Sequence, residues 1–264
     1  RRHTADQAVT AYKTITDVGF DNVSIDLMYG LPDQSLDDWV KTLNTIVGLS
    51  PRHLSLYCLT LEEGTPMERK VKAGNISNRD PDLAADMYSF AEEMLGKRNY
   101  CHYEISNWAQ SGFESLHNLS YWRNESYLGI GPGAHSYIEN LRFWNLKSPR
   151  HYVEALKQVD SLGLKDVVSF EEALDKIPVV ESKESIVGYL EMAETLMMSF
   201  RLNTGVESNK FTQRFGQSLE SVYGQTIDSL VCEGLLERQN GQFKLTRRGR
   251  TLGNEVFVRF FESV

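Results

Sequence analysis

The sequence contains few of the residues that would mark a secreted or metal-clustered protein. Cysteine occurs only as Cys58, Cys101 and Cys232, which are odd in number and far apart. A disulfide framework is therefore excluded, and we expect reduced thiols and a cytoplasmic location. The same spacing excludes a compact three-cysteine site for an iron–sulfur cluster.

Long apolar runs and a basic surface are also absent. No stretch approaches the roughly 20 apolar residues that span a bilayer, and the chain opens on Arg1 and Arg2 without a signal peptide. Membrane association is therefore not expected. The net charge of -8 argues against general nucleic-acid binding, because phosphate contacts favour a basic surface. The missing initiator methionine indicates that the chain is a fragment of a longer protein.

What the sequence does contain begins with a regular alternation of elements. Periodicity predicts a helix over 4–18, a strand over 22–28, a helix over 36–47 and a strand over 53–60. This order is typical of a parallel sheet or a (βα) barrel, whose active sites lie where strands end. Asp26 and Thr60 therefore become site candidates. The alternative is that both are ordinary turn residues.

A further helix is predicted over 80–98 and a strand over 100–105. If that strand belongs to the same sheet, Glu104 and Asn107 lie near the same mouth as Asp26 and Thr60. The alternative is that Glu104 forms a local cap or pair.

Residues 106–147 have weak periodicity and are rich in aromatic residues, Asn, Gly and His. Long irregular segments in compact domains are usually functional loops. Gly129-Ile-Gly-Pro-Gly-Ala134 loosely matches a dinucleotide fingerprint. However, a strand is predicted after it where that fold needs a helix, so we exclude nicotinamide or flavin binding. The glycines would still let the backbone approach a ligand closely.

The segment His117-Asn118-Leu-Ser-Tyr121-Trp122 places an imidazole, an amide, a phenol and an indole within six residues. A neutral imidazole is a good axial ligand for haem iron, and flat rings can stack on a porphyrin. The alternative is a histidine that packs through hydrogen bonds. Four other histidines, His3, His53, His102 and His151, have no partners at metal-ligand spacing, and we interpret them as structural.

The C-terminal part is predicted to be a separate domain. Residues 161–184 lose apolar periodicity and gain acidic residues, which predicts a linker or connecting helix. Helices over 185–200, 207–215, 217–231 and 247–262, with a hairpin over 233–246 that turns at Asn240-Gly241, give a winged-helix pattern. Arg247, Arg248 and Arg250 could contact phosphate, but the acidic residues around them favour a packing role over DNA binding. The predicted domains are 1–160 and 185–264, with 161–184 between them.

Several segments in the same order resemble the oxygen-independent coproporphyrinogen III oxidase-like radical S-adenosylmethionine (SAM) family. They are Asp26-Leu-Met-Tyr-Gly-Leu-Pro-Asp-Gln34, His53–Tyr57, Glu63-Gly-Thr65, Tyr103–Asn107, Tyr127–Ser136 and the C-terminal Leu245-Thr-Arg-Arg-Gly-Arg250. The His117–Trp122 motif is typical of the haem chaperone (HemW-like) branch, and the true oxidase lacks it. The resemblance implies an α/β fold: the C-terminal part of a radical-SAM (βα) partial TIM barrel followed by a small winged-helix-like domain.

The resemblance also implies cofactors and their contacts. SAM contacts fall on Arg1, Asp26, Thr60 and His135, and haem contacts on His117 (as iron ligand), Asn118, Tyr121 and Trp122. The family holds a [4Fe–4S] cluster through a C-x-x-x-C-x-x-C motif, which this chain does not contain. We therefore expect this chain alone to be unable to cleave SAM.

The function implied is that of a haem-binding chaperone that delivers haem to acceptor proteins. The alternative is SAM-dependent oxidative decarboxylation of coproporphyrinogen III to protoporphyrinogen IX, with a porphyrinogen as substrate. A partial barrel exposes a sheet edge and apolar surface, so we also expect two copies to associate.

Overall fold

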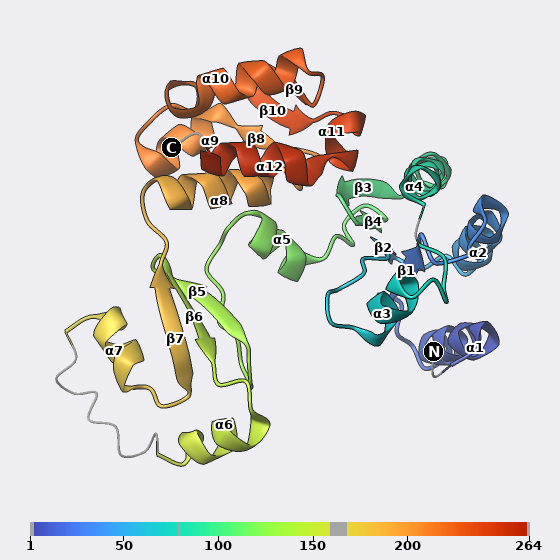
Figure 1. Ribbon diagram of the computed structural model, residues 1–264, viewed down its shortest axis with the longest axis horizontal. Helices are drawn as coiled ribbons and strands as arrows, with labels where there is room; N and C mark the ends of the chain where they lie inside the picture. Colours follow the sequence, from blue (N-terminus) through green and yellow to red (C-terminus); the bar gives the residue numbers. More distant parts are fainter. Residues whose placement is uncertain (1–2, 79, 159–167, 263–264) are drawn as a thin grey trace. The chain divides into compact units, whose positions relative to one another are not determined.

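The computed structural model describes residues 3–78, 80–158 and 168–262, and they form two compact units (Figure 1). The first unit contains the described residues up to Ser115 together with Leu202–Thr204, and the second contains the described remainder. The units therefore meet in the sequence at Ser115 and Leu116. The boundary predicted within 161–184 falls partly outside the described residues and stays a prediction.

The first unit is built on a four-stranded sheet with the strand order β1-β2-β4-β3. Strands β1 and β2 are parallel, as the alternation of elements predicts, whereas β4 runs antiparallel to both of its neighbours. The elements in chain order are α1 (Ala5–Asp17), β1 (Ser24–Tyr29), α2 (Leu36–Gly48), β2 (His53–Cys58), α3 (Pro66–Lys72), α4 (Pro81–Gly96), β3 (Cys101–Glu104) and β4 (Asn107–Ala109).

Local signals explain where these helices begin. The side chains of Thr4 and Ser35 accept hydrogen bonds from the backbone of the first turns of α1 and α2, each in a capping box. Asp80 caps α4 in the same way, directly before Pro81. These caps satisfy backbone N–H groups that have no partner within the helix.

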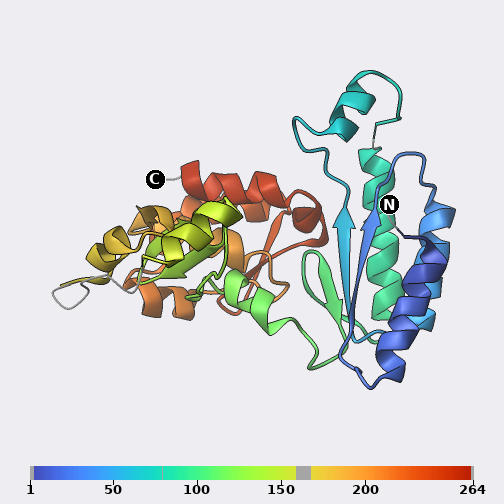
Figure 2. The ribbon, with the colours of Figure 1, turned by 90° about the horizontal axis from the view of Figure 1, so that it is seen from below.

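Helices α2 and α4 cover one face of this sheet and form the core of the first unit (Figure 2). Trp39 of α2 is fully buried, and its indole N–H donates to the carbonyl of Met87 on α4 at 2.9 Å. Leu54 and Trp108 face the helices from the sheet. The opposite face of the sheet carries the polar side chains described below.

The second unit contains two three-stranded sheets, ordered β5-β6-β7 and β8-β10-β9. Its elements in chain order are α5 (Leu116–Trp122), β5 (His135–Ile138), β6 (Leu141–Asn145), α6 (Pro149–Leu156), α7 (Phe170–Lys176), β7 (Val180–Ser185), α8 (Tyr189–Ser199), β8 (Val206–Glu207), α9 (Ser208–Phe215), α10 (Leu219–Cys232), β9 (Leu236–Gln239), β10 (Gln242–Leu245), α11 (Arg247–Thr251) and α12 (Gly253–Glu262).

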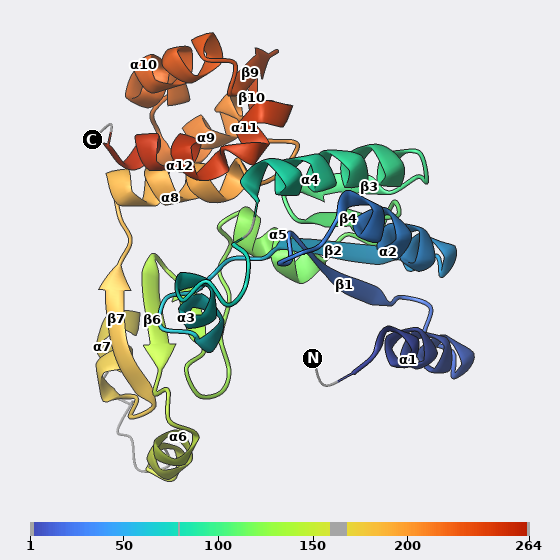
Figure 3. The same ribbon diagram turned by 45° about the vertical axis from the view of Figure 1, so that its right-hand side comes forward.

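Helix α12 lies along α8 (Figure 3), and an aromatic cluster joins the C-terminal helices to α8. Phe200 stacks on Phe260 of α12 with 5.2 Å between ring centroids, and Tyr223 of α10 meets Phe260 edge-on. Strands β9 and β10 form the predicted hairpin. Asn240 and Gly241 both have positive φ, at 52° and 76°, as a type I′ turn requires.

Several predicted segments differ from the structure. Residues 106–147 are not one irregular loop, because they contain β4, α5, β5 and β6. The described part of 161–184 forms α7 and most of β7, an exposed edge strand that pairs with β6. The helix predicted from 185 begins at Tyr189, and the last helix is divided into α11 and α12.

None of the helices in the described ranges is both long and apolar enough to cross a membrane.

Candidate functional site

A row of polar side chains crosses the sheet of the first unit on the face away from α2 and α4. Asp26 lies opposite Ser55, Ser55 opposite Asn107, and Asn107 opposite Glu104 in the strand register. Residues in register on neighbouring strands project from the same face. Ser55, Asn107 and Glu104 are buried, whereas Asp26 is exposed at the end of the row.

A β-bulge in β3 places two consecutive side chains on this face. The register between β3 and β4 shifts between His102 and Glu104. His102 points toward the helices and stacks on Trp108 with 4.0 Å between ring centroids. Tyr103 and Glu104 both contact polar partners instead, because the extra residue interrupts the alternation of the strand.

The buried carboxylate of Glu104 has partners from its own turn. It accepts hydrogen bonds from the Ser106 backbone N–H at 3.0 Å and from the side-chain amide of Asn107. Burial of a carboxylate is costly unless donors surround it, so these bonds hold the turn between β3 and β4.

A second buried network links β1, β2 and β3. His53 has its Nδ1 2.8 Å from the hydroxyl of Ser24 and its Nε2 2.8 Å from the hydroxyl of Tyr103. The backbone N–H of Ser115 donates to the same Tyr103 oxygen at 3.3 Å. Burial lowers the pKa of His53 below its ordinary 6.5, against the opposing effect of Asp26 and Glu114, so the imidazole is neutral at pH 7. Burial also raises the pKa of Tyr103.

The structure does not bring the described members of the predicted SAM site together, although Asp26 lies in the same row as Asn107 and Glu104. Asp26 lies inside β1 and not at its carboxyl end, level with Asn107 and Glu104. Thr60 is exposed beyond the end of β2, two residues after Cys58, which pairs with Tyr29. The two candidates therefore lie at different levels along the strands. Arg1 lies outside the described residues.

His135, the remaining predicted SAM contact, begins β5 in the second unit. It is exposed, and its ring stacks on Trp144 of β6 with 5.5 Å between centroids. The glycine segment before His135 packs closely against the start of β5. A Cβ on Gly129 would lie only 2.1 Å from the His135 carbonyl oxygen. The side-chain amide of Asn145 donates to the carbonyl of Gly131 at 2.9 Å. We expected these glycines to let the backbone approach a ligand closely. For Gly129 this expectation is wrong, because the close approach is to the protein's own backbone.

Helix α5 presents the predicted haem contacts. His117 is exposed, and its Nε2 lies 2.9 Å from the hydroxyl of Tyr121, one helical turn away. The two rings meet edge-on with centroids 4.9 Å apart, and Tyr121 meets Tyr127 edge-on at 4.7 Å. An accessible imidazole is a suitable donor for haem iron. The residues present therefore fit a haem.

Trp122 and its neighbours attach α5 to α8. The guanidinium of Arg201 lies over the Trp122 ring at 4.6 Å, and the Ser199 hydroxyl donates to the Trp122 carbonyl at 3.4 Å. The side-chain amide of Asn124 donates to the Thr195 hydroxyl at 2.9 Å. Trp122 is therefore half-buried as an anchor of the helix, and stacking of its ring on a porphyrin stays a prediction, as does a haem contact of the half-buried Asn118.

The donors for an iron–sulfur cluster are not present in the described part of the chain. The three cysteines lie on separate elements: Cys58 ends β2, Cys101 begins β3 and Cys232 ends α10. The described residues contain no group of three or more His, Cys, Asp or Glu side chains arranged to hold a metal ion. The cluster therefore does not fit this chain.

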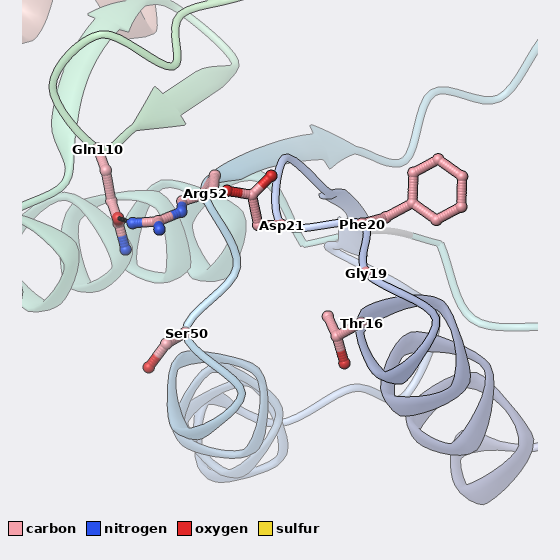
Figure 4. A pocket seen from close by; sticks show the side chains of 7 residues that line it. All are labelled: Thr16, Gly19, Phe20, Asp21, Ser50, Arg52 and Gln110. Carbon is pink, nitrogen blue, oxygen red and sulfur yellow. Dashed lines mark hydrogen bonds between the residues drawn. The ribbon is translucent and has the colours of Figure 1, made fainter.

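Sequence reasoning missed a cavity of about 400 Å³ at the amino ends of β1 and β2 (Figure 4). Arg52 donates to the Gln110 side-chain oxygen at the edge of this cavity at 2.7 Å, and its guanidinium also lies 4.7 Å from the Phe113 ring centroid.

A second cavity of about 370 Å³ in the second unit has an almost wholly apolar lining, which includes Leu128, Ile138, Phe143, Phe170 and Leu174. Neither cavity is lined by a predicted site residue.

Comparisons with known proteins agree with the motifs. The model of the HemN C-terminal domain family matches residues 191–252. The heme chaperone HemW of Lactococcus lactis is 34% identical over 260 residues, which are 98% of this chain and 64% of that protein. The mouse mitochondrial protein named radical S-adenosyl methionine domain-containing protein 1 is 35% identical over 242 residues, 89% of this chain and 52% of its own length.

A solved structure, the coproporphyrinogen III oxidase (HemN) of Escherichia coli, which is a radical SAM enzyme, matches 98% of this chain and 59% of its own. The TM-score is 0.73 and the sequence identity 18%, which is a likeness of the mixed α/β fold. The chain spans 64% of the length of the Lactococcus lactis and Bacillus subtilis relatives, which are both heme chaperones. Over 98% of its length the chain is therefore similar to heme chaperones of the HemW-like radical SAM family.

Proposed function

We propose that this chain binds haem at α5, with His117 as the iron ligand. We propose that it works as part of a haem chaperone, which delivers haem to acceptor proteins. The observation that carries the proposal is the exposed imidazole of His117 on a helix anchored to α8. The heme chaperones among the relatives support the same assignment. Haem would be the cargo, and the chain's task is to hold it and release it.

The roles of the motif residues follow from their contacts. His117 supplies the nitrogen donor, and Tyr121 hydrogen-bonds to it. The contact between Trp122 and Arg201 holds α5 in place, so α5 can bind a ligand without shifting relative to α8. Asn118 lies in the same turn as His117 and is our further candidate for a haem contact.

We infer that the polar face of the first unit's sheet is part of a SAM site, with Asp26 as its best-supported contact. A free carboxylate at the open end of a buried polar row can accept hydrogen bonds from ribose hydroxyls or the amino group of SAM. Thr60, His135 and Arg1 stay candidates on sequence resemblance. Bound SAM supplies an adenosyl group for chemistry that needs an iron–sulfur cluster, so we expect this chain alone not to cleave it.

We further propose that the parallel pair β1 and β2, with α1 and α2, is an arc of a radical-SAM partial barrel. The fold likeness to coproporphyrinogen III oxidase supports this proposal. We also propose that α9, α10 and the sheet β8-β10-β9 form a winged-helix-like domain used for packing. Its basic residue Arg248 donates to the Glu233 carbonyl at 3.1 Å, which favours that role over contact with nucleic acid.

Association of two copies is a proposal with its own support. Among the described strands β1 pairs only with β2, which leaves its other edge open. Helix α1 has no buried residue, and Val18 and Phe20 beside it are 68% and 65% exposed. Open edges and apolar patches favour association. Sedimentation of the chain and of a Val18→Glu, Phe20→Glu variant tests this, and an unchanged monomer in both contradicts it.

The test of haem binding is a titration of haem into the 264-residue chain and into His117→Ala. We expect a Soret band of ligated haem in the parent and at least about tenfold weaker binding in the variant, since loss of an iron ligand removes far more than one hydrogen bond. His151→Ala removes another exposed histidine from a short helix, α6, and is the matched control.

An anaerobic coproporphyrinogen assay on a longer form of the protein that carries the iron–sulfur motif, supplied with SAM and reductant, separates the alternative; haem is titrated into the same form and into its His117→Ala variant. No turnover together with tight haem binding supports the chaperone. Turnover with SAM and equal haem binding in the parent and His117→Ala would favour the oxidase and overturn the proposal.

A further inference from the structure

Nε2 of His117, the outermost nitrogen of the proposed ligand, already has a partner. The hydroxyl of Tyr121 lies 2.9 Å from it. Because the two residues are four apart on α5, this contact stays within one turn of the helix. The contact therefore forms between two residues of α5 itself.

The position of the Tyr121 ring is also restrained from its other side. Tyr127 meets it edge-on, with planes inclined by 82°. Tyr127 is itself fixed, because its backbone N–H and carbonyl exchange two hydrogen bonds with Tyr137 at 2.8 and 2.9 Å. The phenol is thus held against the imidazole by an element outside the helix.

Steric reasoning selects the nitrogen that an iron porphyrin can reach. Nδ1 is bonded to the ring carbon that carries Cβ, so a flat macrocycle centred on it would collide with Cβ and with the helix backbone. Nε2 lies at the far side of the ring. In the part of the chain that the structure describes, His117 has no hydrogen bond at Nδ1 and only the Tyr121 contact at Nε2.

We infer that the Tyr121 hydroxyl competes with haem iron for Nε2 of His117 and so limits how tightly haem is held. This rests on the proposed function of α5. The competition holds for both tautomers. If Nε2 accepts the phenol proton, its lone pair is in use, and the hydroxyl must turn to water before the iron–nitrogen bond forms. If Nε2 carries the proton, that proton must move to Nδ1 through solvent. No electron is transferred in either case.

A competing hydrogen bond suits a protein that must release its cargo. When iron leaves, the Tyr121 hydroxyl recovers its partner, so the ligand-free state is stabilised. A hydrogen bond between neutral groups changes an equilibrium by about two- to tenfold. Tyr121 is therefore expected to weaken haem binding by that factor and to speed transfer.

The decisive variant is Tyr121→Phe in the full 264-residue chain. We expect it to bind haem about two- to tenfold more tightly and to release haem more slowly to excess haem-free globin. Its electron paramagnetic resonance signature should still report histidine ligation. Tyr127→Phe keeps the ring contact and removes a hydroxyl that is not bonded to His117, so it should leave the affinity unchanged. Tyr121→Leu, with a different shape and also no hydroxyl, should change the affinity in the same direction as Tyr121→Phe.

The possible results separate this inference from the proposed function. Weaker binding in Tyr121→Phe would mean that the hydroxyl supports ligation, and unchanged binding would mean that it does not compete. Either result overturns the inference while His117→Ala still loses haem. If His117→Ala keeps full affinity, the proposed function itself fails. Circular dichroism of each variant confirms that α5 and its surroundings have folded.

Discussion

Two histidine–tyrosine pairs in this molecule have nearly the same bond and opposite surroundings. His53 and Tyr103 lie 2.8 Å apart, and His117 and Tyr121 lie 2.9 Å apart. The first pair is buried between strands, and both nitrogens of His53 are engaged. The second pair is exposed on a short helix, and among the residues that the structure describes Nδ1 of His117 has no hydrogen bond.

The difference shows that residue type does not decide which pair can hold a ligand. The first pair joins three strands, so its bonds contribute to folding and no atom is left for a partner. The second pair depends only on its own helix and Tyr127, so its bond can exchange for another. We therefore expect variants of the sheet face to lose stability and variants of α5 to change binding.

The largest effect should come from the packing beneath the polar face. Trp108→Ala removes a fully buried indole that stacks on His102, and we expect a loss of about 3–5 kcal/mol in the free energy of unfolding. Trp122→Ala removes a half-buried indole from α5 and should cost less. Urea denaturation of both variants measures the free energy of unfolding. Equal losses would contradict the expected difference between the sheet and α5.

The next effect concerns the buried carboxylate. Glu104→Ala leaves the Ser106 N–H and the Asn107 amide without that acceptor, and we expect a loss of about 2–3 kcal/mol. The surface variant Glu154→Ala, which removes an exposed pair with Arg150, should cost less than about 0.5 kcal/mol. Thermal denaturation distinguishes the two, and a neutral Glu104→Ala would contradict the importance of the network.

A smaller effect should appear as a pH dependence. Because the folded pKa of His53 is below 6.5, the unfolded state binds more protons as the pH falls, and stability present above about pH 6.5 is lost below it. Asp26 and Glu114 oppose this shift without reversing it. Stability of the parent and of His53→Gln across pH 5–8 tests the prediction. The variant should show a shallower decline, and an identical slope would exclude His53 as its source.

The smallest effect on stability is expected at the proposed ligand. His117→Ala should change the free energy of unfolding by less than about 0.5 kcal/mol, as for an exposed residue, although haem binding falls. A denaturant titration without haem measures this. A loss as large as that of Glu104→Ala would mean that α5 is part of the core and would remove the contrast between the two regions.

Sequence reasoning predicted the elements whose signals are local. Thr4 and Ser35 cap the helices predicted over 4–18 and 36–47, and Asn240-Gly241 is the predicted hairpin turn. The sequence also predicted that Glu104 and Asn107 lie near Asp26, because strands of one sheet bring distant polar residues together. These features depend on a few neighbouring residues or on regular alternation.

Features that depend on distant pairing could not be predicted in the same way. The insertion of β4 between β2 and β3 needs only three residues, which have no periodicity of their own. The partners of His53 are Ser24 and Tyr103, which are 29 and 50 residues away. The anchoring of Trp122 by Arg201 likewise joins residues far apart in the sequence.

The bulge at Tyr103 limits how this segment can change during evolution. Deletion of Tyr103 would restore regular alternation and keep Glu104 opposite Asn107, but it would remove the phenol that lies 2.8 Å from His53. Insertion of one residue would instead turn the phenol away from the histidine. We therefore expect the spacing between His102 and Asn107 to stay fixed among descendants of this sequence, while surface loops such as the one after β2 vary in length.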